Sequence, residues 1–282
     1  MKLGKNYKLL LIVPMAFLIV SIGALINQYN TTGDFFLKSI DLKGGTIITV
    51  NTNASLDREM VESTLSGVGS FNVRETRSLE GYGTIIQTGS EVDTDDVLST
   101  LEASGIDVSD VSIESIGPSL GASFWVQAQL GMITAFIFMG IIVFFIFRTF
   151  VPSFAVIISA VADILMTLGF MQILGIELSL AGFAAILMLI GYSVDTDIML
   201  TSRLLKESEE KTVTEKLRRA LKTGLTMTFT SIGALTALLI SSISVVLSEI
   251  AAVLLIGLAF DIANTWLTNS VILRWYVERR TA

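Results

Sequence analysis

The chain has 282 residues, 52% of them hydrophobic, and contains neither histidine nor cysteine. Its mean hydropathy of +0.71 excludes an ordinary soluble domain, and the lack of cysteine excludes disulfides and thiol chemistry. The formal net charge of −7 is an average over a basic part and an acidic part. Any proton handled within the membrane would have to be carried by carboxylates. We expect no enzyme, no metal and no cofactor.

Six apolar stretches are each long enough to cross a hydrocarbon core of ~30 Å, which takes about 20 helical residues. They lie between Lys8 and Asp34, between Glu114 and Arg148, from Val151 to Leu174, from Leu178 to Ser202, between Lys222 and Glu249, and from Ile250 to Leu273. The lysines before the first stretch also suit a signal peptide, but the run is long and no small-residue cleavage site follows it. The expected fold class is a polytopic α-helical membrane protein with six transmembrane helices, the first of them within residues 1–28.

Lys and Arg gather at one set of span ends. They are Lys2, Lys5, Lys8, Arg148, Arg203, Lys206, Lys211, Lys216, Arg218, Arg219, Lys222, Arg274, Arg279 and Arg280. Because basic residues mark the cytoplasmic side, both termini are expected in the cytoplasm of a multi-pass plasma-membrane protein. Residues 29–120, with 15 Asp and Glu against 5 Lys and Arg, would then form an acidic extracytoplasmic domain.

This insertion has the pattern of a small folded unit. Strand-like runs at Gly45–Val50, Phe71–Leu79, Thr84–Thr88 and Val108–Ile116 are interleaved with two helical patterns, capped by Ser55 and by Thr94. The order β-α-β-β-α-β predicts a ferredoxin-like α+β domain.

Residues 121–282 are expected to hold the second to sixth transmembrane helices. Between the fourth and fifth, residues 203–222 alternate charged and apolar side chains, which predicts an amphipathic helix along the cytoplasmic membrane surface.

Four aspartates interrupt the apolar spans: Asp163, Asp195, Asp197 and Asp261. A carboxylate at the bilayer centre costs roughly 3 kcal/mol or more, so it is seldom present without a role. Asp163 and Asp261 are predicted near the midplane. Asp195 and Asp197 are about 200° apart on a helix, so one is expected to face the interior and the other the cytoplasmic interface. For Asp197, a wet helix-end position is the favoured interpretation.

Small residues precede three of these aspartates by four positions. They are Ser159, Gly191 and Gly257, and they would let a neighbouring helix approach the same face closely. The chemistry predicted is ion coupling by interior acids. The alternative is a set of neutral carboxylic acids that hold the helices together without moving protons.

Short motifs give the chain a family resemblance. Asp41-Leu42-Lys43-Gly44-Gly45-Thr46 and Gly117-Pro118-Ser119-Leu120-Gly121 resemble motifs that flank the first two spans of the SecF family, the smaller half of the SecD–SecF export pair. Ala162 to Gly169, and Gly191 to Asp197 followed by Arg203, are similar to its span-three and span-four signatures. The match covers essentially the whole chain, and its Asp-Thr-Asp pattern resembles archaeal members.

The resemblance implies a half-bundle of the resistance–nodulation–division superfamily. It implies SecD, the Sec translocation channel, emerging unfolded polypeptides and membrane lipid as partners, with no nucleic acid. It also implies that Asp195 or Asp197 responds to protons, with Arg219 as counter-charge. The function expected is that of an accessory subunit that promotes export of polypeptides, coupled to the proton gradient.

Other interpretations stay open. The chain could be a passive scaffold that stabilises SecD and the channel, or a half-transporter of another exporter in the superfamily. An intramembrane aspartyl protease is disfavoured, because the residues before Asp195 do not match Gly-x-Gly-Asp.

Overall fold

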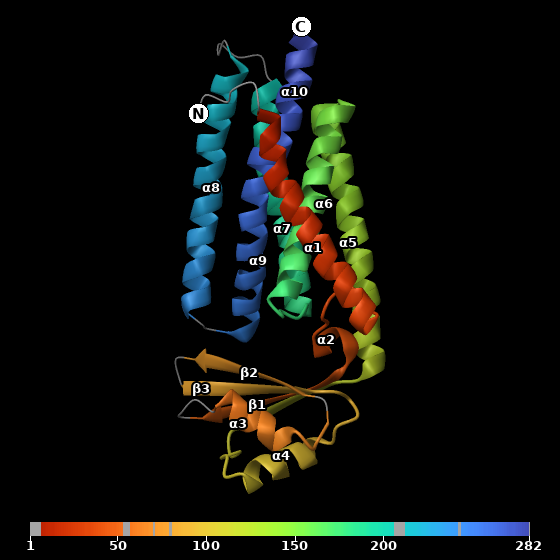
Figure 1. Ribbon diagram of the computed structural model, residues 1–282, viewed down its shortest axis with the longest axis vertical. Helices are drawn as coiled ribbons and strands as arrows, with labels where there is room; N and C mark the ends of the chain where they lie inside the picture. The colour runs from red at the N-terminus through yellow and green to blue at the C-terminus, as the bar shows by residue number, and fades with distance from the viewer. Residues whose placement is uncertain are drawn as a thin grey trace.

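The structure, a computed structural model, describes residues 7–52, 57–69, 71–78, 81–205, 212–241 and 244–281. A long helical bundle carries a small α/β domain at one end (Figure 1). Helix α1 begins, and helix α10 ends, at the end of the bundle remote from this domain. The predictions on Lys2, Lys5, Ser55, Lys206 and Lys211 lie outside the described residues.

Six helical segments are long and apolar enough to cross a membrane, which confirms the predicted number among the described residues. The helices are α1 (Ile12–Thr32), preceded by the 3₁₀ turn η1 (Tyr7–Leu11), α5 (Pro118–Phe147), α6 (Phe150–Ile173), α7 (Leu180–Leu205), α8 (Val213–Ser241), α9 (Val245–Ala263) and α10 (Ser270–Thr281). A π-helical turn, η2 (Asn264–Asn269), joins α9 to α10, and together they make the sixth span.

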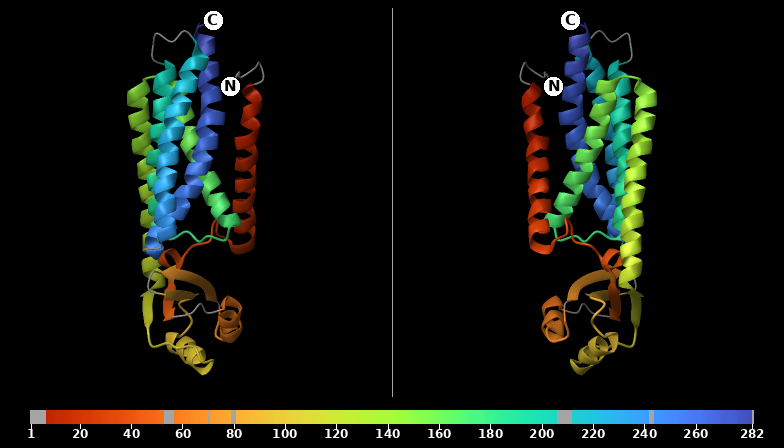
Figure 2. Two further views of the ribbon diagram at one scale, coloured as in Figure 1. Left: turned by 90° about the vertical axis from the view of Figure 1, so that its left-hand side faces the viewer. Right: turned by 90° about the vertical axis from the view of Figure 1, so that its right-hand side faces the viewer.

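Helices α6 and α7 form the centre of the bundle. In the most apolar 18-residue stretch of each helix, 67% of the residues of α6 and 56% of those of α7 are buried, against 11% in α5 and in α8. Helix α6 packs against α1, α5, α7 and α9, and α7 packs against α5, α8 and α9. The two side views place α1 and α5 on opposite sides of the bundle (Figure 2). The aspartates of α6 and α7 therefore belong to the most enclosed part of the molecule.

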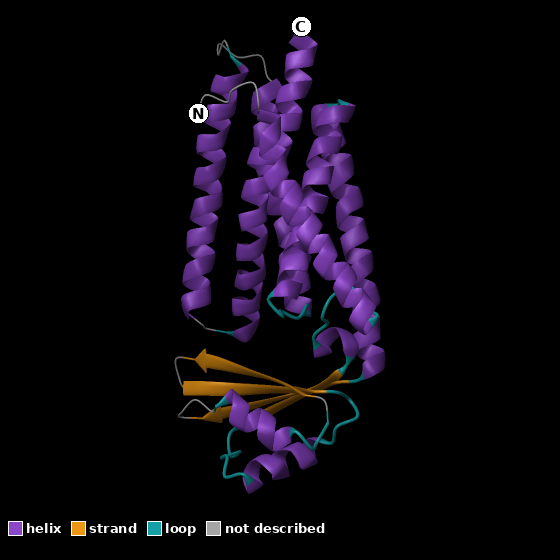
Figure 3. Cartoon of the chain, in the orientation of Figure 1, coloured by secondary structure: helices purple, strands orange, loops and turns teal. Residues whose placement is uncertain are grey.

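The α/β domain has the predicted β-α-β-β-α-β order. Its strands are β1 (Gly45–Thr52), β2 (Phe71–Ser78), β3 (Gly81–Thr88) and β4 (Val111–Ile116), and its helices are α3 (Arg58–Leu65) and α4 (Thr94–Ala103). All pairings are antiparallel, and the strand order is β2-β3-β1-β4. The sheet lies between the bundle and the α3–α4 layer (Figure 3). Alternate strand residues point to the two faces, so one face forms the domain core with the two helices.

Two details of this domain differ from the sequence prediction. The described N-caps are Asp57 and Asp93, whose carboxylates accept hydrogen bonds from Glu59 N and Asp95 N. A carboxylate at a helix N-terminus also interacts favourably with the helix dipole, so it replaces the predicted cap at Thr94. The third strand, predicted over Thr84–Thr88, begins earlier, at Gly81.

The predicted surface helix over residues 203–222 is wrong in the described part of that range. Arg203 ends α7, and α8 starts at Val213 and continues through the membrane-length segment without a break. Leu217 and Ala220 are buried against Leu200 and Leu204 of α7. Leu217 and Ala220 therefore pack within the bundle, whereas Leu221 is exposed.

Glycines join the α/β domain tightly to the second span. The short helix α2 (Ile40–Lys43) ends at Gly44, whose φ of +85° suits glycine. A Cβ on Gly44 would lie 2.6 Å from Pro118 Cα, and a Cβ on Gly121 would lie 2.7 Å from Gly44 N. The two motifs that carry the family resemblance are thus packed against each other.

Candidate functional site: a buried carboxylate cluster

Three carboxylates from three helices are completely buried in the middle of the bundle. Asp163 of α6, Asp197 of α7 and Asp261 of α9 each have 0% of their surface exposed. Asp163 is the fourteenth residue of α6, so it lies about 20 Å along that helix. Burial of three acids together requires bound protons or bound cations, because like charges in a medium of low dielectric repel strongly.

Hydroxyl and amide groups donate to these carboxylates. Asp163 Oδ2 accepts from Ser193 Oγ at 2.6 Å, and Asp163 Oδ1 accepts from Asn264 Nδ2 at 2.8 Å. Asp197 Oδ1 accepts from Asn269 Nδ2 at 2.7 Å. These bonds tie α6 to α7 and tie both helices to η2.

One hydroxyl is shared between two of the acids. Thr265 Oγ1 lies 2.9 Å from Asp197 Oδ1 and 3.1 Å from Asp261 Oδ1. A threonine hydroxyl has one hydrogen and can donate to only one of these oxygens at a time. The second contact becomes a hydrogen bond only when the other carboxyl carries a proton of its own. The geometry therefore suits a pair of acids that share a proton.

The π-helical turn supplies most of the donors. Asn264, Thr265 and Asn269 belong to η2, and all three are at most 1% exposed. A π turn widens the helix and rotates the following residues, and such turns often occur at functional sites. Here it brings three polar side chains of one segment to face α6 and α7.

Several oxygens of the cluster accept no hydrogen bond from the described chain. They include Asp197 Oδ2, Asp261 Oδ2, Thr201 Oγ1 and the Ser159 hydroxyl. Among the described residues, no group of three or more acidic side chains has the arrangement of a metal site. Asp197 Oδ2 and Asp261 Oδ2 are therefore acceptor atoms that no described side chain uses.

Asp195 lies on the opposite side of α7 from the cluster. Its side chain is exposed, as are Gly191 and Tyr192 one turn away. The prediction that one of Asp195 and Asp197 faces the interior is confirmed, and the prediction that the other faces the cytoplasmic interface stays a prediction. The wet helix-end interpretation of Asp197 is wrong, because Asp197 is fully buried and hydrogen-bonded, and Asp195 is the exposed one.

Arg219 is not brought to the cluster. Its side chain is exposed on α8, five residues before Gly224, and a Cβ on Gly224 would overlap the Trp266 ring of η2. Five helical residues correspond to about 7.5 Å along the axis, which places Arg219 nearer the end of the bundle that is remote from the α/β domain. That Arg219 acts as the counter-charge to the proton-responsive aspartate stays a prediction.

The small residues before the aspartates have different surroundings. A Cβ on Gly257 would overlap Leu189, so α9 and α7 approach closely there, as predicted. Ser159 is buried. Gly191 has nothing within 4 Å of the position of a Cβ, so it packs closely against no other helix among the described residues.

The remaining motif residues make contacts at or near the junction between the α/β domain and the helical bundle. Asp41 Oδ2 accepts from Leu180 N, at the N-terminus of α7, at 3.4 Å. Gly45 has a φ of +142°, and a Cβ there would overlap the Thr88 carbonyl. Thr46 Oγ1 donates to Ser115 Oγ at 3.1 Å, which links β1 to β4. Gly117 is the N-cap of α5 and Pro118 is its first residue.

Comparisons with known proteins bear on this architecture. The family model described as protein export membrane protein SecD/SecF, C-terminal, matches residues 96–279. A protein-export membrane protein SecF of Methanocaldococcus jannaschii is 41% identical over 99% of this chain and 98% of its own length. The chain belongs to the SecD/SecF family. A SecF of Pyrococcus furiosus is 39% identical over 97% of this chain and 92% of its own length.

The fold is also that of a SecD/SecF protein. The crystal structure of SecDF, a translocon-associated membrane protein from Thermus thermophilus, superposes with a TM-score of 0.76 at 20% identity. The match covers 98% of this chain and 39% of the SecDF chain, so the present chain spans well under half of that protein. The predicted family, the polytopic six-helix fold class and the multi-pass membrane character are confirmed, and the chain is a membrane protein of a protein-export family.

Proposed function

We propose that this chain is the smaller subunit of an export machine that works with a SecD partner. In it, ion movement through the Asp163–Asp197–Asp261 cluster drives a change of shape that promotes translocation of secreted polypeptides. The observation that carries the proposal is the sharing of the Thr265 hydroxyl between Asp197 and Asp261, both completely buried. Loss or gain of one proton changes which hydrogen bonds can form there.

The conformational step follows from that competition. With one proton on the pair, both contacts to Thr265 are hydrogen bonds and α7 is held to α9. Without it, two buried negative charges face a single donor, and repulsion favours separation or rotation of these helices. Because α7 and α9 carry the two acids, their relative motion is the expected consequence.

Contacts at the domain end of the bundle would carry this motion to the α/β domain. Gln172 Oε1, at the end of α6, accepts from Leu37 N at 2.9 Å. Leu178 N donates to Leu37 O at 2.7 Å, and Ser39 N donates to Leu178 O at 2.9 Å. Asn72 of β2 donates to Glu177 Oε1 at 3.0 Å. The end of α6 and the α6–α7 loop are thus attached at several points to the α/β domain and to the segment that leads into it.

A partner helix would cover the exposed face of α7. Ala184, Met188, Gly191, Tyr192 and Asp195 recur at three- and four-residue spacing and are all exposed. A carboxylate facing lipid is costly, whereas small residues permit close helix packing. We assign this face to the SecD partner, with the α/β domain outside the cell and both termini in the cytoplasm, in accord with the placement of Arg148, Arg203 and Arg279.

Export of a reporter protein in cells tests the proposal. Asp197→Asn keeps the size of the side chain and an acceptor oxygen but cannot gain or lose a proton, so export is expected to fall to the level of a deletion strain. Ser202→Ala, at an exposed position on the same helix, is the matched control and should export normally. Recovery of SecD on the affinity-purified variant shows whether the complex has formed.

Two results would count against coupling. Unchanged export with Asp195→Asn and Asp197→Asn combined, and SecD association intact, would leave a passive scaffold. Loss of SecD from the Asp197→Asn variant, with export restored by overproducing SecD, would also favour the scaffold.

A further inference from the structure

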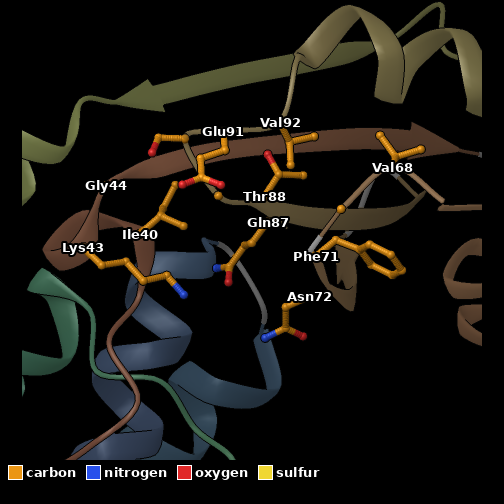
Figure 4. A pocket seen from close by; sticks show the side chains of 13 residues that line it. Ile40, Lys43, Gly44, Val68, Phe71, Asn72, Gln87, Thr88, Glu91 and Val92 are labelled. Atoms are coloured by element: carbon orange, nitrogen blue, oxygen red, sulfur yellow. The ribbon is translucent and has the colours of Figure 1, made fainter. Parts of the chain in front are cut away.

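A pocket of about 640 Å³ lies in the α/β domain, away from the carboxylate cluster. It is lined by α2, by the first residues of β2 and the loop before them, and by the end of β3 with the loop that leads to α4 (Figure 4). Its volume falls within the usual range for small-molecule sites in proteins. Its lining residues take no part in the carboxylate cluster, so the pocket calls for an explanation of its own.

Two side-chain amides form the polar wall of the pocket. Asn72 and Gln87 are directly paired across β2 and β3, and their side chains point to the same side of the sheet as that of Lys43 (Figure 4). Gln87 is 7% exposed, and its Oε1 accepts no hydrogen bond from the described chain. A buried amide oxygen without a donor costs about 1–3 kcal/mol, so this atom indicates a ligand that brings a hydrogen-bond donor.

The polar groups of the pocket carry no net charge and include both donors and acceptors. Among the described lining residues, Lys43 is the one base and Glu91 the one acid, and both are exposed. An ammonium group only donates hydrogen bonds, an ionised carboxylate only accepts them, and an amide does both. An anionic ligand would be repelled by Glu91, whereas a hydroxyl group can donate to one of these groups and accept from another. The lining therefore suits a neutral ligand with several hydroxyl groups.

The rest of the lining is apolar. Val68, Phe71 and Val92 are half-buried, line the pocket and pack against the core of the domain. A sugar ring has hydroxyl groups around its edge and C–H groups on its two faces. Ligand sites usually combine apolar walls with a few polar groups that fix the orientation of the ligand. A sugar ring therefore matches this lining, with a C–H face on the apolar side chains and its hydroxyl groups on the amides.

The pocket lies close to the end of the bundle at which the spans leave the membrane. Asn72 Nδ2 donates at 3.0 Å to Glu177 Oε1, in the loop between the membrane-length helices α6 and α7. Lipid headgroups occupy about 5–7 Å on each side of the hydrocarbon core. A lining residue that contacts the end of a span is therefore near the depth of the headgroups, and a membrane lipid is the nearest source of a sugar.

We propose that this pocket binds the neutral, sugar-bearing headgroup of a membrane lipid. Ring hydroxyl groups bind the amides of Asn72 and Gln87, and a face of the ring packs on Val68, Phe71 and Val92. A lipid held in this way ties the α/β domain to the membrane surface. The proposal does not rest on the proposed function, because neither the carboxylate cluster nor an exported chain takes part in the binding.

The test uses the purified full-length protein in micelles of a detergent that carries no sugar. The probe is methyl maltoside, an uncharged disaccharide without a lipid chain, and its dissociation constant is measured by saturation-transfer NMR. Gln87→Leu should weaken binding about tenfold, the usual consequence of one buried hydrogen bond left unmade. Ser90→Phe fills the pocket from an exposed position and should abolish binding. Thr49→Val, on the same face of the sheet but outside the pocket, is the control and should bind normally.

Nanodiscs of phosphatidylcholine that contain the protein identify the source of the sugar. Diglucosyl diacylglycerol added to the discs should displace methyl maltoside, and diacylglycerol without the sugar should not. Binding of methyl maltoside that the glycolipid does not displace would refute the lipid as the source.

The proposal is overturned if the original chain does not bind methyl maltoside. It is also overturned if Gln87→Leu and Ser90→Phe, with unfolding by denaturant unchanged, both bind it as the original chain does. Binding of glycerol phosphate, an anionic headgroup, in place of the disaccharide would likewise overturn it. Each of these failures leaves ion coupling intact, and loss of ion coupling would leave the sugar site intact.

Discussion

Asp195 and Asp197 are two residues apart on α7 and differ completely in environment, so they give a matched test of the cluster. Asp197 accepts from Asn269 at 2.7 Å and from Thr265 at 2.9 Å, with no exposed surface. Asp195 is exposed. Replacement of each by leucine should therefore have very different effects on the free energy of unfolding.

The magnitude follows from the donors that Asp197→Leu would leave behind. The Asn269 amide loses its acceptor while buried, which costs about 1–3 kcal/mol. Thr265 keeps Asp261 as an acceptor at 3.1 Å, so the loss of its hydrogen bond to Asp197 adds little. We expect Asp197→Leu to lower the free energy of unfolding by about 1–3 kcal/mol. Asp197→Asn, which retains an acceptor oxygen for Asn269, should lower it less.

Asp195→Leu should change the free energy of unfolding by no more than about 0.5 kcal/mol, because its side chain contacts little within the chain. Unfolding of the purified protein in micelles, followed by circular dichroism on denaturant titration, measures all three variants. Equal losses at the two positions would refute the assignment of Asp197 to the interior and Asp195 to the outer face.

Two further predictions concern the α/β domain and its junction. Gly44→Ala should destabilise the protein by about 1–3 kcal/mol, because its Cβ would lie 2.6 Å from the α5 backbone. Gly117→Ala, with nothing within 4 Å of its Cβ position, should cost much less in the same denaturant titration, and equal effects would refute a tight junction. Hydrogen bonds from the Ser109 hydroxyl and N–H lower the pKa of Asp107 below its ordinary value. These bonds therefore stabilise the folded protein at a pH above the unfolded-state pKa of Asp107, and this stabilisation is lost as the pH falls through its folded-state pKa. Ser109→Ala should raise the pKa of Asp107 in an NMR titration, and an unchanged pKa would show that the hydroxyl has no part.

The six spans and the β-α-β-β-α-β domain could be predicted from the sequence because each rests on a local pattern. Span length is set by the thickness of the bilayer, and successive side chains of a strand alternate between the two faces of the sheet. The caps at Asp57 and Asp93 were missed by one or two residues, because several neighbouring side chains are equally good caps and only the backbone direction selects one. The surface helix over residues 203–222 was predicted wrongly, because alternating charged and apolar residues also suit the end of a long span.

Which face of a membrane helix is buried is harder to predict, and this explains why the sequence did not show which aspartate of α7 points into the site. Lipid is as apolar as a protein interior, so hydrophobic periodicity does not show which side of α7 is buried. The opposite orientation of Asp195 and Asp197 follows from helix geometry, but which one points inward does not. Asn264, Thr265 and Asn269 were missed as site residues, although three polar residues shortly after Asp261 in an apolar span could have indicated them. The π turn that aligns them has no sequence signal of its own.

Proton movement across vesicles that contain the protein together with SecD tests the central claim most directly. With an imposed membrane potential, a pH-sensitive dye inside the vesicles should report proton flux for the original pair and none for Asp197→Asn. The Ser202→Ala control should conduct normally. Flux that persists with Asp197→Asn, in vesicles shown to contain both subunits in equal amounts, would contradict the account.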